Sequence, residues 1–582
     1  MKMKKSNIFL FVLICLGLQM SFAQKKDENI GSEVVNVVKP YTASISDAFK
    51  VKEVPSLDDD ETAKKETITY SIFSFPVAST FTPSKGKAAA VEKTAKEKLF
   101  ANYASLAAGN YATINAELYL THQFDSKSYI ATSIKHLSSQ GGIKNILLDD
   151  YFYNTAFELT YGKKEKQMSW NLDLGYQNQV YNWYGFQSVT MPLTETGAFL
   201  DDINEKQKYN SLFVGGNIAF NESFVDHVNV KFNHFADAFS SAENQLSIKP
   251  SFKFDFLDET IKTNVILDYV KGNFKTSYFD PIAINYGFTN FGINPSFNIN
   301  KDDLSVNLGA SFFYSMPNGN GSNKFYIYPS VTASLKVVGD LMIAFAGAEG
   351  SLKQNTYREF VDINNFLSPT LNITPTDSKY DIYAGLKGKL ANSVSYTVKA
   401  SYLNEGYKPL FVTNSYSSFN PNKEGYTYGN SFGLVYDDVK TISAYAELKA
   451  DFSKNVTFGI NGTFSNYTMK SETQAWNLPN LKLSSSLNYS ISPKWETGFN
   501  LFYVGERFDR EQFSFDGFVS IIEEVKLDGY VDLNTHVNYK HSDRLTFFLK
   551  GNNLASQNYL KWLGFPVQGI QVLLGANFKF DF

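Results

Sequence analysis

Residues that could carry acid–base or metal chemistry are few in this chain, and their spacing argues against a catalytic centre. The six histidines of the 582 residues are His122, His136, His227, His234, His536 and His541. His227 and His234 are seven residues apart, which places them on opposite faces of a β-strand, so they cannot share a metal ion. His541-Ser542 falls in an expected turn without a placed acid, which argues against a serine–histidine hydrolase. The sequence therefore predicts no enzyme, no metal site and no cofactor.

Two further motifs resemble ligand-binding loops only in composition. The run Asp58-Asp59-Asp60-Glu61 lacks the spaced ligands and central glycine of an EF-hand, and such a charge run is typical of a solvated linker. Asn318-Gly319-Asn320-Gly321 suits a turn, and no lysine follows it in a phosphate-binding position. The formal net charge is −4, and a mildly acidic chain is a poor binder of nucleic acid. We therefore expect no nucleic-acid partner.

The N-terminus carries the features of an export signal. Lysines lie between Lys2 and Lys5, an apolar run extends from Ile8 to Leu18, and Ser21-Phe22-Ala23 forms a small-x-small cleavage site. This pattern predicts a signal peptide over residues 1–23. The chain's single cysteine, Cys15, lies inside the apolar run, so the mature chain would have no disulfide. A lipoprotein signal at Cys15 is the alternative, but the isoleucine before it is bulkier than such signals normally allow.

Beyond the leader, hydrophobic residues alternate with polar ones. No stretch approaches the roughly 18 consecutive apolar residues of a transmembrane helix. In one example Met168, Trp170, Leu172, Leu174 and Tyr176 interleave with Ser169, Asn171, Asp173, Gly175 and Gln177. The same alternation recurs over residues 112–124, 304–314 and 442–452. These segments extend over about 10–14 residues, closer to outer-membrane barrel strands than to the shorter strands of soluble sheets.

Connections between these segments alternate between short and long. Short polar turns are expected at 124–127, 257–260, 300–303, 339–340, 391–393, 453–455, 490–494 and 541–543. Longer connections are expected at 182–207, 353–377, 410–425 and 506–526. The pattern predicts an all-β fold, a transmembrane antiparallel β-barrel of about 22 strands. We expect it to occupy residues 98–582 in the outer membrane, after a short, mostly irregular periplasmic segment at 24–97, with both termini periplasmic.

The C-terminal sequence resembles that of TonB-dependent receptors over about the last 60 residues. The matching residues are Asp528 to Asn534, Leu545 to Leu549, Asn552-Asn553-Leu554, Tyr559, Gly564-Phe565-Pro566, Gly569 and the terminal Phe582. Phe578, Phe580 and Phe582 alternate on the last expected strand and form a C-terminal barrel signal. The resemblance implies an outer-membrane receptor for solute uptake or ligand binding, with membrane lipids and, during biogenesis, the barrel-assembly machinery as partners.

The N-terminal segment departs from that family, whose members carry a folded plug domain before the barrel. Residues 24–97 are few and are interrupted by prolines and charge runs, so we expect at most a remnant plug. Thr67 to Val77 is expected to form one strand or to insert into the barrel mouth. A short apolar segment resembles the box that pairs with TonB by strand addition; it contains Glu33, Val34, Val35, Val37 and Val38. A plain edge strand or linker is the alternative reading of this segment.

Two groups of residues are candidates for function inside and above the barrel. The lumen-lining candidates are Asn115, Glu117, Asn171, Asp173, Lys231, Asn233, Lys387, Lys389, Glu447 and Lys449. Both charge signs occur among them, so they predict no strong ion preference. The loop candidates for a ligand or partner surface are Trp183, Tyr184, Phe186, Arg507, Arg510, Phe513 and Phe515. The loop aromatics could equally fold over the lumen as a cover.

Two functions from different classes remain open. The receptor-like C-terminal motif favours a barrel that takes up or binds a solute, without the plug-pulling mechanism. The short N-terminal segment favours a scaffold or accessory barrel within an assembly or secretion complex, with a surface lipoprotein or other outer-membrane subunits as partners. The substrate cannot be read from the sequence.

Overall fold

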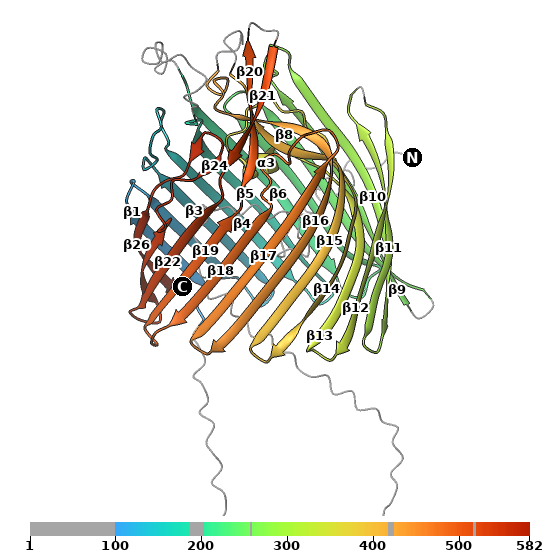
Figure 1. Ribbon diagram of the computed structural model, residues 1–582. Helices are drawn as coiled ribbons and strands as arrows, with labels where there is room; N and C mark the ends of the chain where they lie inside the picture. The colour runs from blue at the N-terminus through green and yellow to red at the C-terminus, as the bar shows by residue number, and fades with distance from the viewer. Residues whose placement is uncertain (1–98, 186–202, 257–258, 320, 417–423, 516–518) are drawn as a thin grey trace, which may run out of the picture. The chain divides into compact units, whose positions relative to one another are not determined.

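The computed structural model describes residues 99–185, 203–256, 259–319, 321–416, 424–515 and 519–582 (Figure 1). The expected leader, the valine-rich segment at 33–38, the acidic run at 58–61 and the segment at 67–77 lie outside the described residues. So does the loop candidate Phe186.

A closed antiparallel barrel of 22 strands makes up most of the chain, which confirms the predicted fold class. The first ten strands are β1 (Asn102–Gly109), β2 (Ile114–Gln123), β3 (Ser128–Ser139), β4 (Phe152–Lys164), β5 (Met168–Asn182), β6 (Lys206–Phe220), β7 (Val225–Asp237), β8 (Ala242–Phe256), β9 (Glu259–Phe274) and β10 (Ile284–Lys301). The next nine are β11 (Leu304–Pro317), β12 (Lys324–Val338), β13 (Met342–Lys353), β14 (Thr376–Ala391), β15 (Val394–Thr413), β16 (Phe432–Ser453), β17 (Val456–Met469), β18 (Leu481–Ser490) and β19 (Trp495–Val504). The last three are β22 (Tyr530–Lys540), β23 (Leu545–Asn552) and β26 (Gln571–Phe580).

The last strand closes the barrel on the first. In β26, Phe578 pairs with Ala104 of β1 on one side and with Leu545 of β23 on the other. Because the sheet closes on itself, it has no free edge. Its backbone N–H and C=O groups therefore find hydrogen-bond partners within the protein, which lipid cannot provide. The side chains of Phe578, Phe580 and Phe582 follow one another in ring contact along this strand and its end.

Short turns and long connections lie at opposite ends of the barrel, as the sequence predicts. At the short-turn end Asp302 and Asp303 alone join β10 to β11, and Asp302 has a φ of 48°, the left-handed conformation of a two-residue hairpin turn. The expected connection at 410–425 is found at 414–431. The expected loop at 506–526 is largely a hairpin of β20 (Arg507–Phe515) and β21 (Val519–Leu527).

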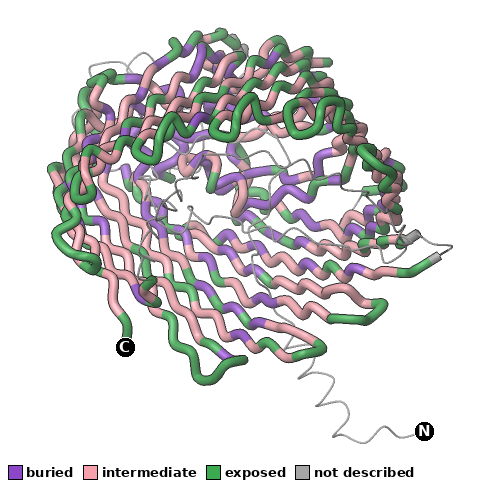
Figure 2. The backbone as a smooth tube through the Cα atoms, turned by 90° about the horizontal axis from the view of Figure 1, so that it is seen from below, coloured by how far each residue is buried: buried purple, intermediate pink, exposed green. Residues whose placement is uncertain are grey.

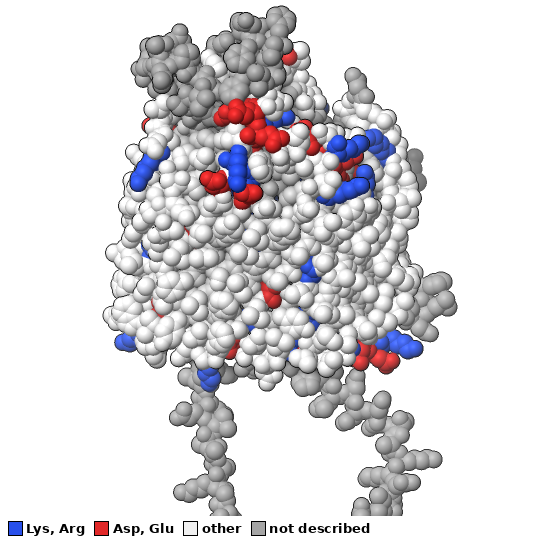
Figure 3. Space-filling model, in the orientation of Figure 1, with Lys and Arg blue, Asp and Glu red and all other residues white. Residues whose placement is uncertain are grey.

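Alternation along each strand separates an apolar outer face from a polar inner one. In β5, Leu172 and Leu174 are 37% and 38% exposed, whereas Asp173 between them is 8% exposed. The register pairs Asp173 with Gly215 and Gln179 with Tyr209, so Asp173 lies on the same face as Tyr209, which points into the barrel. Few charged side chains appear between the two ends of the barrel on the face shown in Figure 3. On this face the outer surface therefore has the apolar belt that a membrane-spanning barrel requires.

Helical elements contribute little to the part of the chain that the structure describes. Helix α3 (Tyr357–Ile363) lies in the connection between β13 and β14. A small hairpin of β24 (Leu560–Trp562) and β25 (Phe565–Pro566) lies between β23 and β26. Within the described ranges, no helix is long and apolar enough to cross a membrane.

Candidate functional site

A cluster of buried, mostly aromatic side chains lies at the mouth of the barrel, at the long-connection end, and we call it the loop core. Its loop members are Trp183, Tyr184, Tyr278, Tyr357, Phe360, Val361, Leu367, Leu371, Ile373, Tyr426, Trp562 and Phe565. Its strand members are Tyr209, Phe235, Val270, Phe274, Tyr286, Phe411 and Phe432. Viewed along the barrel from the short-turn end, buried segments lie inside the ring of strands (Figure 2). The long connections thus fold inward and pack on the inner wall.

Helix α3 is fastened to the barrel wall at its first turn. The carboxylate of Glu243, in β8, accepts hydrogen bonds from the backbone N–H groups of Tyr357 (N···O 2.7 Å) and Arg358 (3.2 Å). It also accepts one from the hydroxyl of Tyr286 in β10 (2.7 Å). Thr356 caps the helix, its hydroxyl accepting from the N–H of Glu359 (3.1 Å). A wall carboxylate therefore satisfies donors that the helix itself leaves unpaired.

Tyr357 packs this helix against the wall. Its ring lies edge-on to Phe274 and Phe235, with centroid separations of 4.9 and 5.1 Å. Its hydroxyl donates to the carboxylate of Asp237 (2.9 Å). Burial raises the pKa of Tyr357 well above its ordinary value, so the hydroxyl stays protonated and remains a donor. The helix therefore has both an apolar and a polar attachment to the inner wall.

Contacts between different connections bind the loop core into one unit. The side-chain amide of Asn430 donates to the carbonyl of Trp183 (2.8 Å), and the hydroxyl of Tyr184 donates to the carbonyl of Pro566 (3.0 Å). The rings of Phe366 and Phe565 stack at 3.9 Å. Four connections that are distant in sequence are thereby joined at the centre of the mouth.

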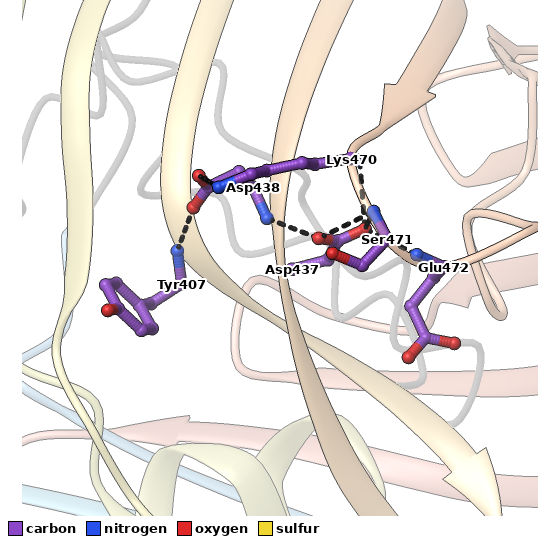
Figure 4. A network of polar contacts seen from close by, with 6 residues as sticks. All are labelled: Tyr407, Asp437, Asp438, Lys470, Ser471 and Glu472. Carbon is purple, nitrogen blue, oxygen red and sulfur yellow. Dashed lines mark hydrogen bonds and ion pairs between the residues drawn. The ribbon is translucent and has the colours of Figure 1, made fainter.

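A backbone-binding carboxylate also anchors the connection between β17 and β18, as Figure 4 shows. Asp437 of β16 accepts hydrogen bonds from the backbone N–H groups of Lys470 (3.1 Å), Ser471 (2.8 Å) and Glu472 (2.8 Å). Its neighbour Asp438 accepts from the N–H of Tyr407 and pairs with the Lys470 ammonium (3.2 Å). These interactions hold the connection in its folded conformation. They account for the adjacent acidic residues Asp437 and Asp438 without a bound ion.

The hairpin β20–β21 is attached to the end of β15 through Asp509. This carboxylate is fully buried and accepts from the N–H (3.1 Å) and the hydroxyl (2.9 Å) of Thr413. Burial raises the pKa of Asp509 above its usual range, and its hydrogen bonds oppose that shift. The base of the hairpin is therefore held at the rim of the mouth.

The lumen-lining candidates are spread along the wall and do not converge. Asp173 accepts hydrogen bonds from Thr160 (2.6 Å) and Asn171 (2.7 Å), and Asn233 donates to Gln245 (3.1 Å). Other placements are Asn115 buried and Glu117 half-buried in β2, Lys231 over the Phe213 ring, Lys387 over the Phe345 ring, Lys389 exposed in β14, and Glu447 paired with Lys449 in β16. No group of three or more metal-ligating side chains occurs in the described segments. The polar side chains of the inner wall thus interact in separate local pairs and do not form one shared site.

The structure places the loop candidates in different surroundings. Trp183 and Tyr184 are buried in the loop core. Arg507 is buried at the rim, and the Arg510 guanidinium lies 3.7 Å from the Glu472 carboxylate. The side chains of Phe513 and Phe515 lie outside the described residues, as does all of Phe186.

Several residues of the mouth were not singled out from the sequence. Helix α3 and its wall partner Glu243 were missed, although Thr356-Tyr357-Arg358-Glu359 has the Thr-x-x-Glu pattern of a capping box. Glu243 has no local signal, because its partners in helix α3 are more than a hundred residues away. Gly564-Phe565-Pro566 was noted only as part of the receptor-like motif, and it places Phe565 at the centre of the loop core.

Comparison with known proteins gives structural similarity without sequence similarity. No protein-family model matches the chain, and no curated protein matches it. The ferripyoverdine receptor of the outer membrane of Pseudomonas aeruginosa superimposes with a TM-score of 0.60 at 13% identity, over 84% of this chain and 72% of that one. The FrpB iron transporter from Neisseria meningitidis gives 0.61 at 10% identity, over 83% and 82%. The copper transporter OprC gives 0.59 at 12% identity, over 83% and 81%. The chain therefore shares the 22-strand barrel fold of TonB-dependent outer-membrane receptors.

Proposed function

We propose that this protein is an outer-membrane barrel of the receptor type, which binds or takes up a solute through a mouth closed by its own connections. The observation that carries the proposal is the loop core, in which residues of five connections pack with residues of the inner wall. Outer-membrane barrels of about 22 strands are wide enough to need an internal obstruction. In this protein, aromatic packing at one end of the lumen supplies one.

The fold supports the receptor class. Proteins with the same barrel include a receptor bound to ferripyoverdine, an iron transporter and a copper transporter. The ligands in these names are those of the neighbouring proteins and are not assigned to this chain. For this chain, the location in the outer membrane with both termini periplasmic, and an uptake route that does not depend on pulling a plug, are parts of the proposal.

Opening would require the connections to leave the wall. The anchors to be released are hydrogen bonds to Glu243, Asp237 and Asp509, together with the ring contacts of Tyr357 and Phe565. Their summed strength is large enough that the closed state would dominate without a ligand or partner. Binding at the mouth is therefore the expected trigger for passage.

The alternative function is a non-transporting scaffold for an outer-membrane complex. The same loop core favours it, because a closed mouth presents a fixed surface and no route for solute. A surface lipoprotein or another complex subunit would then be the partner. Stoichiometric co-purification of such a subunit, with no change in solute entry when the gene is deleted, would support this alternative.

Single-channel recording in planar bilayers tests the proposed closure. The full chain is expected to show little or no conductance, and a variant with residues 355–374 replaced by a glycine–serine linker should conduct. Replacing residues 321–323, none of which belongs to the loop core, with a linker of equal length is the control. A large, stable conductance of the unaltered protein would contradict closure by the connections.

A further inference from the structure

Arg507 occupies a buried position at the rim of the barrel mouth, where β20 begins. It is 5% exposed. One terminal nitrogen of its guanidinium donates to the carbonyl of Leu560 (2.7 Å), and the guanidinium carbon lies 5.4 Å from the centre of the Tyr530 ring. Its Nε–H is buried and has no hydrogen-bond acceptor in the described part of the chain. The charge is thus held in place by a neutral carbonyl and an aromatic face.

Lys561 brings a second positive charge to the same place. It follows Leu560, whose carbonyl accepts the Arg507 hydrogen bond, in the inward-folded strand β24. Burial, with the nearby Arg507 charge, lowers the pKa of Lys561 to about 8. Among the described residues, no carboxylate forms an ion pair with either side chain. Within the described part of the chain, neither cation therefore has a carboxylate as counter-ion.

Two stacked tyrosines form the wall beside these cations. The rings of Tyr530 and Tyr559 are parallel, with centroids 3.8 Å apart. The Tyr559 hydroxyl donates to the carboxylate of Asp532 (2.9 Å). Asp532 thus accepts from the tyrosine, and no ion pair joins it to Arg507 or Lys561 in the described residues.

Arg507 is buried without a counter-ion among the described residues, which is costly because its charge loses hydration without gaining an opposite charge, and the half-buried Lys561 adds a second positive charge. Binding an anion removes that cost. Arginine suits an oxyanion, since its N–H groups are rigidly spaced, and lysine adds a mobile donor and charge. We propose that Arg507 and Lys561, beside the Tyr530–Tyr559 stack, form a binding site for a small oxyanion group, either a carboxylate or a tetrahedral oxyanion such as a phosphate or sulfate.

The oxyanion site would identify one chemical group of the proposed receptor's ligand. Only that assignment, of the anion as part of the ligand, rests on the proposed function. Binding to purified protein and solute entry into cells are separate measurements. Absence of anion binding would overturn the site and leave the receptor proposal in place. Anion binding without any effect on solute entry would retain the site and favour the scaffold.

Isothermal titration of the full chain in detergent tests the site, with sodium sulfate and sodium acetate as the probes and sodium chloride maintaining the ionic strength. We expect saturable binding of one or both probes, which also distinguishes the tetrahedral from the carboxylate ligand. Lys561→Gln should weaken binding at least tenfold, and Arg507→Gln should abolish it. Lys526→Gln is the matched control, because Lys526 lies on the same hairpin but is paired with Glu506; its affinity should stay within twofold of the unaltered protein.

The unaltered protein supplies a test that does not depend on folded variants. Sulfate keeps its charge between about pH 7 and about pH 10, whereas Lys561 loses its proton in that range. The other titratable or charged groups around the pair are Arg507, Tyr530, Tyr559 and Asp532. Sulfate affinity should therefore fall as pH rises, and Lys561→Gln should remove most of that dependence. Absence of saturable binding by both probes, or equal binding by Lys561→Gln and the unaltered protein, would overturn the proposal.

Discussion

Glu243 in the barrel wall and Tyr357 in helix α3 are joined by a hydrogen bond of 2.7 Å from the backbone N–H of Tyr357 to the Glu243 carboxylate. The same carboxylate accepts from Arg358 and Tyr286, so one side chain satisfies three donors in a buried site. This arrangement ties an inward-folded connection to a strand that is over a hundred residues away. Removal of the Glu243 carboxylate should therefore loosen the connection at the mouth more than it destabilises the barrel strands.

Glu243→Ala is expected to release α3 from the wall. Each of the three donors that lose their acceptor costs about 1–3 kcal/mol when it stays buried. We expect faster protease cleavage within 354–375 and a higher bilayer conductance, with an unchanged heat-modifiable band on detergent gels. Glu447→Ala is the control, since that wall carboxylate interacts with Tyr445 and Lys449 and not with a connection. Equal cleavage of both variants would contradict the anchoring role.

Phe565→Ala is expected to loosen the centre of the loop core. The ring contacts Phe366, Tyr184 and Phe432, and removing a buried phenylalanine ring typically costs about 3–5 kcal/mol. Amide hydrogen exchange should accelerate over 354–375 and 553–570 while the strands remain protected. Leu147→Ala is the control, because Leu147 lies in the connection between β3 and β4, is 57% exposed and does not belong to the loop core. Unchanged exchange in Phe565→Ala would mean that the connections are held without this ring.

The barrel could be predicted from sequence because its determinants are local. Period-two alternation around Leu172 and the polar turn at Asp302-Asp303 define strand faces and hairpins from neighbouring residues alone. The loop core depends on pairs such as Glu243 with Tyr357 and Tyr184 with Pro566, whose separation along the chain leaves no periodic trace. The aromatic residues around Trp183 were noticed, yet composition alone could not distinguish a ligand surface from a packed cover. Lys561 was not noticed, because a single lysine between Leu560 and Trp562 has the same pattern as any solvated strand residue.

Leu172→Arg is expected to destabilise the barrel by about 2–4 kcal/mol if residue 172 lies near the bilayer midplane, since the outer face of β5 is in contact with lipid. Folding yield into lipid vesicles at increasing urea concentrations measures the effect. Leu172→Met, which retains an apolar side chain of similar volume, should fold as the unaltered protein does. Asp173→Arg should also be costly, for a different reason, because it removes the acceptor of Thr160 and Asn171. Equal folding of Leu172→Arg and Leu172→Met would show that this face does not meet lipid.

Asp509 should make the attachment of the β20–β21 hairpin pH-dependent. Its folded-state pKa is raised above the ordinary value of 3.8, so the folded protein binds more protons than the unfolded one at pH values above 3.8. The stability contributed by this group is therefore greatest at low pH and falls as pH rises toward the folded-state pKa. Protease cleavage of the hairpin should increase as pH rises through that window. In Asp509→Asn, which keeps the shape and the acceptor oxygen, cleavage should be independent of pH there; an identical pH profile would refute the assignment.

Any solute uptake by this protein is expected to be independent of the valine-rich segment at Glu33 to Val38. In the proposed mechanism the loop core closes the mouth, so passage would require release of connections at the outer rim rather than withdrawal of a plug. Deleting residues 33–38 should leave solute entry and cell growth unchanged, whereas replacing 355–374 should raise entry without an energy source. Uptake measured with and without a protonophore separates the two routes. If the deletion of residues 33–38 alone abolished energy-dependent uptake, the protein would have to work as a TonB-dependent transporter, and the loop core would be a cover above a driven mechanism.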